Sequence, residues 1–581
     1  MKSSILAKYS GQSLVRFDGS YSAAFLRNGR ALSTLPTRHH GLACKSLREM
    51  SMRSSTIRPA HRYFSTTHSR QGKAPIVTSQ HNERVEKIST VIREFYERKE
   101  KWRINHGSTN STRPLDSKKN LVHTTDLSNI LEIDMEKRTC LAEPNVPMDR
   151  LVEATLGCGL VPLVVPEFPG ITVGGSYSGT CGESSSFKHG FFDKSVSSVE
   201  MVLATGDVTM LSPDQNSDLF YGAAGALGTF GVTTLVELRL QPAKRFVKAT
   251  YYPVGSIREA IETIQKFCLD SSLEYIDGIM FDPKSGVIVT GRLTDSADAS
   301  SSVVRFGRRS DPWFYLHAQE NGRRGGVHVE YTPLADYLFR YDRGGFWVGT
   351  AAFEYFKVPF NRFTRWALDD FLHTRMMYTA LHASGQSKRF VVQDLALPYE
   401  TAEEFISYTQ HELGIWPLWL CPLQATSMPT MHPHSLLQVA NPEANPSNSL
   451  LNIGLWGWGP KDADEYVRKN RELEKKLKGL GGMKWLYAQT YYDEREFWQQ
   501  FDRPWYEALR SAYKATTLPN VYDKVKRDES SPDKVAAARA WEKTSIFRRL
   551  IGQWPFAGLY GIKKAIESRS YLAARKSEWK R

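Results

Sequence analysis

Residues 172–184 read TVGGSYSGTCGES, and this stretch says more about the fold than any other part of the chain. It holds four glycines and six hydroxyl side chains, but only one carboxylate. Glycine lets a ligand approach the backbone closely, and hydroxyl and amide groups bind phosphate oxygens without a lysine or arginine. We therefore interpret the stretch as a loop that holds a cofactor pyrophosphate, formed by Thr172, Val173, Gly174, Gly175, Ser176, Tyr177, Ser178, Gly179, Thr180, Cys181, Gly182, Glu183 and Ser184.

Two familiar phosphate loops are excluded by the spacing of these residues. No Gly-Lys-Ser/Thr follows, so the stretch is not a Walker loop, and it lacks the GxGxxG spacing of a Rossmann turn. A second glycine-rich stretch, 225–232 (GALGTFGV), lies about 45 residues further on. Two such loops in one compact unit can hold two parts of a large cofactor.

The net charge of +14 is concentrated at the N-terminus of the chain. Residues 1–80 contain thirteen Lys or Arg but only Asp18 and Glu49, so they carry +11 and the other 501 residues only +3. A nucleic-acid-binding protein would show a basic face on its folded domain, so this distribution excludes that class.

The basic N-terminal arm, residues 1–72, has the composition of a mitochondrial transit peptide. It is rich in arginine and serine, and apolar residues are spaced among the arginines. A disordered basic arm, or a start placed upstream of the true one, would give the same pattern. No window of the chain approaches the roughly 18 consecutive apolar residues of a membrane-spanning helix.

The six cysteines are far apart and form no CxxC pair. They predict neither a disulfide framework nor a metal site, and their spacing is typical of a protein in a reducing compartment.

The pattern of apolar residues predicts an α+β fold in two domains. A charged helix over 82–100 is followed by a helix over 146–156, with Pro147 in its first turn and the glycines of 157–159 at its end. The runs 198–204 and 208–211 predict a hairpin across the turn 205–207, and 233–240 alternates as a strand. From about 245, helices such as 257–267 alternate with aromatic strands such as 416–421 and 453–458, whose rings would form core or line an apolar ligand site. We expect a basic arm at 1–72, a cofactor domain at 73–244, a substrate domain at 245–525 and a basic aromatic tail at 526–581.

The C-terminal tail mixes aromatic and basic residues. Residues 541–581 carry ten Lys or Arg against three Glu, with Trp554 and Phe556 among them. Such a segment suits a membrane interface, but a solvated capping helix would have the same composition, and both interpretations stay open.

Longer matches spread over both domains now identify a family. TVGGSYSGTCGESSSFKHGFF (172–192), the run 216–248, VVQDLALP (391–398) and LYAQTYYDEREFW (486–498) resemble the Δ24-sterol reductases, the seladin/diminuto group. These enzymes belong to the p-cresol methylhydroxylase-type FAD-binding superfamily, and the resemblance covers approximately residues 85–525.

The resemblance implies a two-lobed FAD-binding domain followed by a substrate-binding cap. The first glycine stretch would hold the FAD pyrophosphate, with the loop NHGSTNSTR (105–113) against the cofactor from the other lobe. By the same resemblance, Gly228, Gly231 and Val232 would bring backbone groups towards the flavin and contact it. Three features depart from the family. Cys181 stands where many relatives keep a glycine or a similarly small residue, and residues 526–581 have no counterpart that we recognise in the animal enzymes. The family's usual N-terminal membrane segment is replaced by the transit-like arm.

The reaction implied is reduction of an isolated side-chain alkene. NADPH would reduce FAD, the flavin would deliver hydride to the more substituted alkene carbon, and an acid would protonate its neighbour. Asp394 and Tyr487 lie in well-matched cap segments and are candidates for that acid, although a structural hydrogen bond would explain either. The substrate would be a sterol or another isoprenoid alkene.

Two other functions remain open at this point. One is a flavin oxidase or dehydrogenase that acts on an alcohol, sugar lactone or hydroxy acid, and the other is a flavin- or sterol-binding protein without turnover. Many of those oxidases attach FAD through a His that follows a glycine; here His106 precedes Gly107, so we expect non-covalent FAD. By resemblance we expect peripheral association with the endoplasmic reticulum membrane, while the arm favours the mitochondrion. Nothing in the sequence predicts an oligomeric state.

Overall fold

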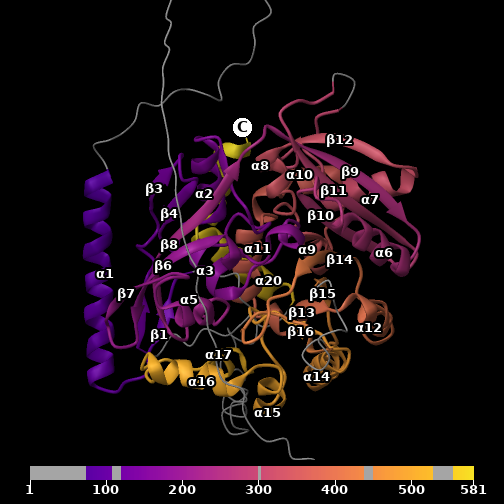
Figure 1. The fold of residues 1–581 in the computed structure, drawn as a ribbon. Helices are drawn as coiled ribbons and strands as arrows, with labels where there is room; N and C mark the ends of the chain where they lie inside the picture. The colour runs from indigo at the N-terminus through magenta and orange to yellow at the C-terminus, as the bar shows by residue number, and fades with distance from the viewer. Residues whose placement is uncertain (1–73, 108–119, 299–301, 438–448, 528–553, 581) are drawn as a thin grey trace, which may run out of the picture. The chain divides into compact units, whose positions relative to one another are not determined.

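The structure is a computed structural model that describes residues 74–107, 120–298, 302–437, 449–527 and 554–580. The N-terminal arm of residues 1–72 lies outside the described residues. All described residues belong to one compact unit, Thr66–Arg581. Two large antiparallel sheets with helices packed on them organise this unit, which confirms the predicted α+β fold (Figure 1).

The first sheet is built around its longest strand, β8. Buried side chains alternate along β8 at Val232, Thr234, Val236 and Leu238, as expected for a strand with one face in the core. The predicted hairpin is confirmed, since β6 and β7 pair antiparallel. The strand order is β3-β4-β8-β6-β7 with β5 beside β8, and the bounds are β3 Ile130–Asp134, β4 Thr139–Ala142, β5 Leu160–Pro162, β6 Val196–Leu203, β7 Val208–Leu211 and β8 Gly231–Pro242.

Short helices connect the strands of this region. A two-stranded parallel ladder, β1 with β2, precedes the sheet. The helix predicted from residue 146 begins at Met148, with Pro147 as its extended N-cap residue rather than in its first turn. The bounds are β1 Arg103–Asn105, β2 Leu121–His123, α2 Met148–Leu156, α3 Val173–Gly179, α4 Ser186–His189, the 3₁₀ helix η1 Phe192–Ser195, and α5 Ser217–Ala223.

The long helix α1, Ala74–Glu97, packs along the first sheet (indigo in Figure 1). Its apolar stripe of Val85, Ile88 and Ile92 is buried. His81, on the same helix, is 2% exposed; one ring nitrogen lies 2.9 Å from Glu143 Oε1 and the other 3.1 Å from Glu200 Oε1. Burial alone would lower the pKa of His81, but these carboxylates outweigh burial and raise it to about 9. The imidazolium therefore ties α1 to the sheet.

The second sheet has eight strands, and all of its pairings are antiparallel. The first sheet ends at Pro242 and this one begins at Phe246. The strand order is β12-β9-β11-β10-β14-β15-β13-β16, with bounds β9 Phe246–Val254, β10 Tyr275–Asp282, β11 Ser285–Thr294, β12 His328–Pro333, β13 Phe390–Leu397, β14 Leu418–Gln424, β15 Ser449–Trp458 and β16 Met483–Lys484.

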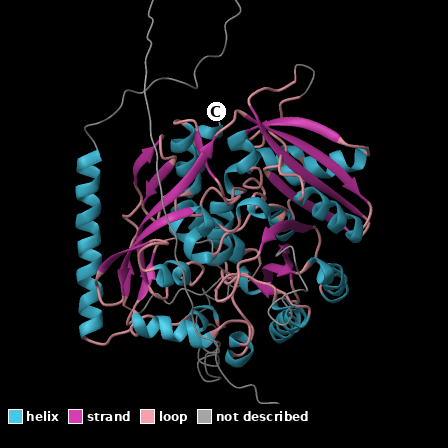
Figure 2. Ribbon diagram, in the orientation of Figure 1, coloured by secondary structure: helices cyan, strands magenta, loops and turns pink. Residues whose placement is uncertain are grey.

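Both faces of the second sheet are apolar, and they serve different purposes. On β14, Leu418 and Leu420 pack under three helices, whereas Trp419 and Cys421 point to the opposite side. Successive strand residues face opposite sides of a sheet, so the near-continuous apolar runs of this domain bury both faces. The helices on the first face are α6 Ile257–Cys268, α12 Tyr399–Glu412 and α14 Ala463–Gly479; α7 Phe314–Arg324 packs on β9 and β11 from the other side (Figure 2).

A helical segment separates β12 from β13. Its aromatic residues Phe346 and Trp347 pack against Trp456 of β15, with ring centroids 4.5 and 5.4 Å away. The segment therefore stands beside the inner face of the second sheet. It comprises α8 Leu334–Leu338, α9 Val348–Phe356, α10 Arg362–Ala367, η2 Asp369–Phe371, α11 Thr374–Ala383 and η3 Gln386–Lys388.

Three helices that follow the second sheet in the chain pack against the region of the first sheet. Tyr506 Oη donates to Thr229 Oγ1 (2.9 Å) and Arg510 donates to Thr229 O (2.6 Å). Trp102 Nε1 donates to Thr517 Oγ1 (3.2 Å). The end of the range 245–525, expected to belong to the substrate domain, thus packs on the cofactor domain through α15 Glu494–Trp498, α16 Arg503–Ala512 and α17 Val521–Val525.

The C-terminal tail forms α20 Phe556–Glu567, α21 Ser570–Lys576 and η5 Glu578–Lys580. On α20, Ala557, Gly561 and Ala565 recur every four residues and are buried. A Cβ at Gly561 would lie 2.5 Å from Ala380 O of α11, so only glycine permits this approach. Arg575 pairs with Asp370 (2.5 Å). Among the described residues, none of the helices combines the length and apolar character that crossing a bilayer requires.

The pKa of His81 predicts a specific pH dependence of stability. The folded pKa, about 9, exceeds the unfolded value of 6.5, so the bound proton stabilises the fold fully below pH 6.5, and that contribution is lost as the pH rises through about 9. We expect His81→Gln to lower the free energy of unfolding by about 2 kcal/mol at pH 6 and by much less at pH 9.5.

Urea unfolding at both pH values measures the difference, with the exposed His123→Gln as the matched control. An equal loss at pH 6 and pH 9.5 would contradict the proposed imidazolium bridge.

Candidate functional site

A cavity of about 1550 Å³ lies between the glycine segments and the inner face of the second sheet. Pockets of roughly 300–1,000 Å³ hold one drug-sized ligand, so this volume suits a large cofactor together with a second molecule. Its walls come from elements far apart in the chain: β1, α3, the start of β8, α9, α11, β13, β15 and α20.

The first glycine segment, Thr172–Ser184, is partly helical rather than a loop throughout. Thr172 caps α3, because its side chain accepts a hydrogen bond from Gly175 N (3.2 Å). Helical periodicity divides the segment into two faces. The residues that line the cavity are Thr172, Gly174, Gly175, Ser178, Gly179, Cys181 and Gly182.

The other predicted residues of this segment lie behind that wall. Tyr177 Oη donates to Phe220 O (3.2 Å), and Thr180 O accepts from Trp485 Nε1 (2.6 Å). The carboxylate of Glu183 accepts from Ser184 Oγ (2.7 Å). These side chains hold the segment in place, and direct contact with a cofactor stays a prediction for Val173, Ser176, Tyr177, Thr180, Glu183 and Ser184, none of which lines the cavity.

The second glycine segment, Gly225–Val232, is hydrogen-bonded directly to the first. Gly225 N donates to Tyr177 O (3.1 Å) and Leu227 N donates to Ser178 O (2.9 Å). Gly228 has a φ of +67°, a conformation that favours glycine, and a Cβ there would meet Ile104 at 2.9 Å. Gly228, Gly231 and Val232 all line the cavity, and their contact with a cofactor stays a prediction.

Three basic residues that the sequence analysis did not single out also line the cavity. They are Arg103, Lys524 and Arg527. Lys524 Nζ donates to Leu227 O (2.5 Å), which places it beside the second glycine segment. No local motif marks them as a group, because Arg103 lies more than 400 residues before Lys524 and Arg527 in the sequence. Positive charge at this wall suits a pyrophosphate.

The predicted loop 105–113 is described only in part. His106 lines the cavity, while Ser108–Arg113 lie outside the described residues. Two close-packed glycine segments, hydroxyls at Thr172 and Ser178, and nearby cations together fit a dinucleotide with a pyrophosphate.

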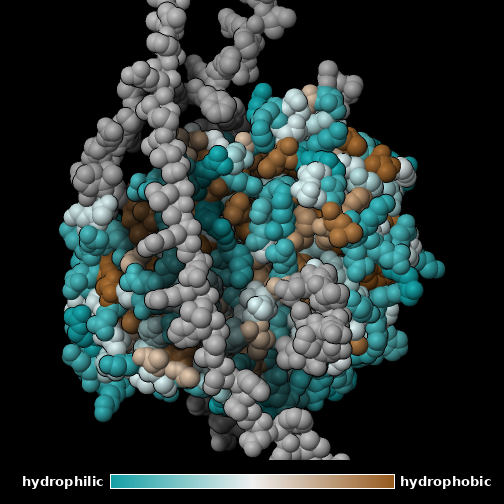
Figure 3. Space-filling view, viewed as in Figure 1, coloured by the Kyte–Doolittle hydropathy of each residue, from teal (hydrophilic) through white to brown (hydrophobic). Residues whose placement is uncertain are grey.

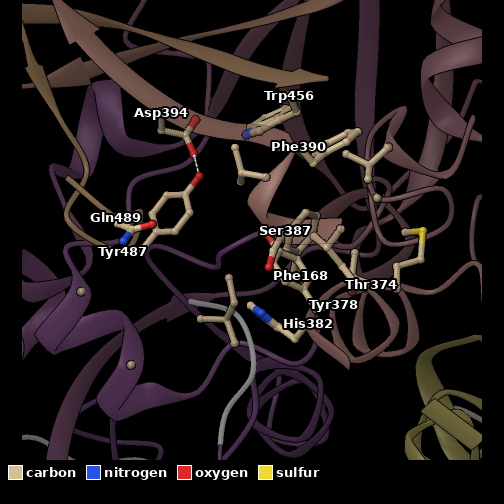
Figure 4. Close-up of a pocket in the computed structure, with 18 of the residues that line it drawn as sticks. Phe168, Thr374, Tyr378, His382, Ser387, Phe390, Asp394, Trp456, Tyr487 and Gln489 are labelled. Atoms are coloured by element: carbon tan, nitrogen blue, oxygen red, sulfur yellow. Dashed lines mark hydrogen bonds between the residues drawn. The ribbon is translucent and has the colours of Figure 1, made fainter. Parts of the chain in front are cut away.

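Asp394 and Tyr487 lie together on the wall of this cavity. Tyr487 Oη donates to Asp394 Oδ2 (2.7 Å), and Asn452 Nδ2 donates to Asp394 Oδ1 (3.0 Å) (Figure 4). Burial raises the pKa of Asp394, and the two hydrogen bonds lower it. Burial is the larger effect, so the pKa of Asp394 rises to about 6. Burial and the negative charge of Asp394 raise the pKa of Tyr487 well above its usual value. The pair can therefore hold a proton near neutral pH.

The part of the cavity beyond this pair is mostly aromatic and apolar. Phe168, Tyr378, Phe390 and Trp456 surround it in Figure 4. The aromatic residues of the second domain thus divide between core and cavity wall: Phe405, for example, is fully buried under the sheet. Such walls suit a large apolar ligand and exclude water.

Glu167 is a further cavity residue that the sequence analysis did not single out. It is 7% exposed, lines the cavity, and immediately precedes Phe168. The sequence gives no signal for it, because only the fold shows that this glutamate is buried. Across the described ranges, no group of His, Cys, Asp or Glu residues is arranged to hold a metal ion.

Comparisons with known proteins agree with this geometry. Residues 82–212 match the model of the FAD-binding domain family. The Delta(24)-sterol reductase of Homo sapiens is 31% identical over 411 residues, which cover 69% of this chain and 76% of that protein. The Rattus norvegicus enzyme is 30% identical over 461 residues (77% and 86%), and the Arabidopsis thaliana enzyme 29% identical over 445 residues (71% and 78%).

Proposed function

The chain belongs to the Delta(24)-sterol reductase family, and we propose that it uses NADPH to reduce the side-chain Δ24 double bond of a sterol. It is an FAD-dependent oxidoreductase that acts on a carbon–carbon double bond. One observation supports the proposal above all: a part-buried carboxyl–phenol pair lies in a cavity that has glycine segments at one wall and aromatic residues at another.

The residues of the chain have distinct tasks in this reaction. A bound FAD, once reduced by NADPH, supplies the hydride. We assign the proton to the carboxyl group of Asp394, since an unactivated alkene is a weak base and needs a stronger acid than a phenol. Tyr487 orients that carboxyl group through its 2.7 Å hydrogen bond. The aromatic walls keep water away from the reacting carbons.

Turnover of a Δ24 sterol tests the proposal. We expect the purified full chain, given NADPH and sterol anaerobically, to form a product with two additional hydrogens in the side chain, as seen by mass spectrometry. Denaturation should release free flavin, because we propose that FAD is bound non-covalently. NADPH-reducible flavin without sterol product would favour another alkene or an oxidase function, and absence of turnover with any reductant would favour a binding protein.

The pair Asp394–Tyr487 predicts a pH profile. If the neutral acid is required, kcat falls tenfold per unit as the pH rises above about 6, the pKa of Asp394. Asp394→Asn should lower kcat by about 10²–10⁴-fold while flavin stays bound. Tyr487→Phe removes a hydrogen bond that lowers the pKa of Asp394, so its pH profile should move to higher pH.

Tyr355→Phe is the matched control, because it removes another phenol from the cavity wall, one whose hydroxyl has no hydrogen-bond partner among the described residues. Full turnover by flavin-loaded Asp394→Asn, or an unmoved profile in Tyr487→Phe, would refute the assignment.

We also propose that α20 rests on a lipid surface, in agreement with the membrane-interface interpretation of the tail. Its outward residues Phe556, Leu559 and Ile566 are 49%, 51% and 44% exposed, and Lys563 lies among them. Its other side contributes Gly558 and Ile562 to the cavity wall. By contrast, hydrophobic residues are scattered among hydrophilic ones on the face drawn in Figure 3. An apolar substrate would then have a short path from bilayer to cavity.

Sedimentation with anionic lipid vesicles tests this proposal. The triple variant Phe556→Ser/Leu559→Ser/Ile566→Ser should lose most vesicle binding, since each side chain is half exposed and contributes to insertion. The control is Leu269→Ser, at an apolar residue that is 87% exposed on the second domain. Equal binding by both variants would exclude α20. Imaging of a tagged chain would then separate the endoplasmic reticulum, which we propose, from the mitochondrion.

A further inference from the structure

A cluster of buried charged residues lies directly behind the wall of the cavity. Asp277 and Arg340 are both about 1% exposed or less, and Arg340 Nη2 lies 2.9 Å from Asp277 Oδ2. Tyr341 Oη (2.7 Å) and Trp419 Nε1 (3.1 Å) donate to the same oxygen. The only guanidinium of this cluster is thus already paired with one carboxylate.

Two further carboxyl groups share the cluster without a cation of their own. Glu183 accepts hydrogen bonds from the hydroxyls of Ser184 and Ser185. Glu167 faces Glu183 and Asp277, with Arg340 as the balancing charge and the thiols of Cys181 and Cys421 nearby. Burial first, and the charge of Glu183 second, raise the pKa of Glu167 well above its usual value. One positive charge cannot balance three carboxylates at a site that excludes water. Glu167 therefore stays protonated, because ionising it would add an unpaired buried charge.

Glu167 differs from the rest of the cluster because it reaches the cavity. It lines the wall together with Cys181 and Gly182, whereas Glu183, Asp277 and Arg340 do not. Its Oε1 atom is buried and has no hydrogen-bond partner among the described residues. A buried polar atom without a partner is costly, so it indicates a missing ligand.

The position of Glu167 indicates which ligand atom it meets. The next residue, Phe168, packs against Phe346 and Tyr378 of the second domain, with centroids 5.7 and 6.1 Å apart. Five residues later Thr172 begins the first glycine segment. Glu167 therefore stands where the cofactor wall meets the substrate wall, and the reacting ring of a flavin must lie at that junction.

We propose that Glu167, as a neutral carboxylic acid, donates a hydrogen bond to a heteroatom of the flavin ring and makes the flavin easier to reduce. Reduction adds negative charge to the ring, which a donated hydrogen bond stabilises and an ionised carboxylate would oppose. The inference rests on flavin binding and does not depend on the identity of the alkene.

The test measures the flavin midpoint potential of the full-length holoenzyme against redox dyes, without sterol. Glu167→Ala should shift the oxidised-to-reduced equilibrium about tenfold toward the oxidised flavin, which is about 30 mV for a two-electron couple. Glu167→Gln keeps a neutral donor and should stay within about twofold of the wild type. Glu237→Gln, at a half-buried glutamate away from the cavity, is the matched control.

A second measurement keeps the proposal testable if Glu167→Ala does not retain flavin. The absorption spectrum of the wild-type flavin should change at alkaline pH as Glu167 ionises, and Glu167→Gln should lack that change. An unshifted potential in Glu167→Ala, or a pH-dependent spectrum that persists in Glu167→Gln, overturns the proposal. Loss of sterol turnover at an unchanged potential would also overturn it, because Glu167 would then act on the substrate.

Discussion

Two backbone hydrogen bonds, from Gly225 N to Tyr177 O and from Leu227 N to Ser178 O, fix the two glycine segments against each other. Main chains come this close only where side chains are small or point away, which is the physical reason for glycine on both sides. The rest of the molecule is positioned from this junction. Trp485 of the second domain donates to Thr180 O, and Tyr506 of α16 donates to Thr229.

The second sheet gives the cavity its chemistry because its strands are apolar on both faces. Asp394 pairs with Gly454, and Asn452 lies two residues along β15 on the same face, within reach of the carboxyl group. The opposite face of these strands is covered by α6, α12 and α14. A carboxyl group on the inner face is therefore largely shielded from water, and this desolvation raises its pKa.

Much of the fold could be predicted from local patterns. The hairpin β6–β7 followed from its turn, α2 from Pro147 and the glycines after it, and β8 from its alternating residues. The resemblance also singled out Gly228, Gly231 and Val232, which lie on the cavity wall, while their contact with a cofactor stays a prediction. The helical character of α3 did not, because glycine and serine are poor helix formers and the capping by Thr172 depends on the surrounding packing.

The sequence by itself determined the α+β class and the two glycine segments, because both follow from the local spacing of residues. It also determined the candidates Asp394 and Tyr487, because both lie in long runs that match the family. Only the tertiary structure decided that these two side chains share a hydrogen bond, that Lys524 meets Leu227, and that Glu167 lies buried beside Glu183. Such contacts join residues far apart in the chain. Burial and charge balance arise from all neighbours at once, so no local pattern contains them.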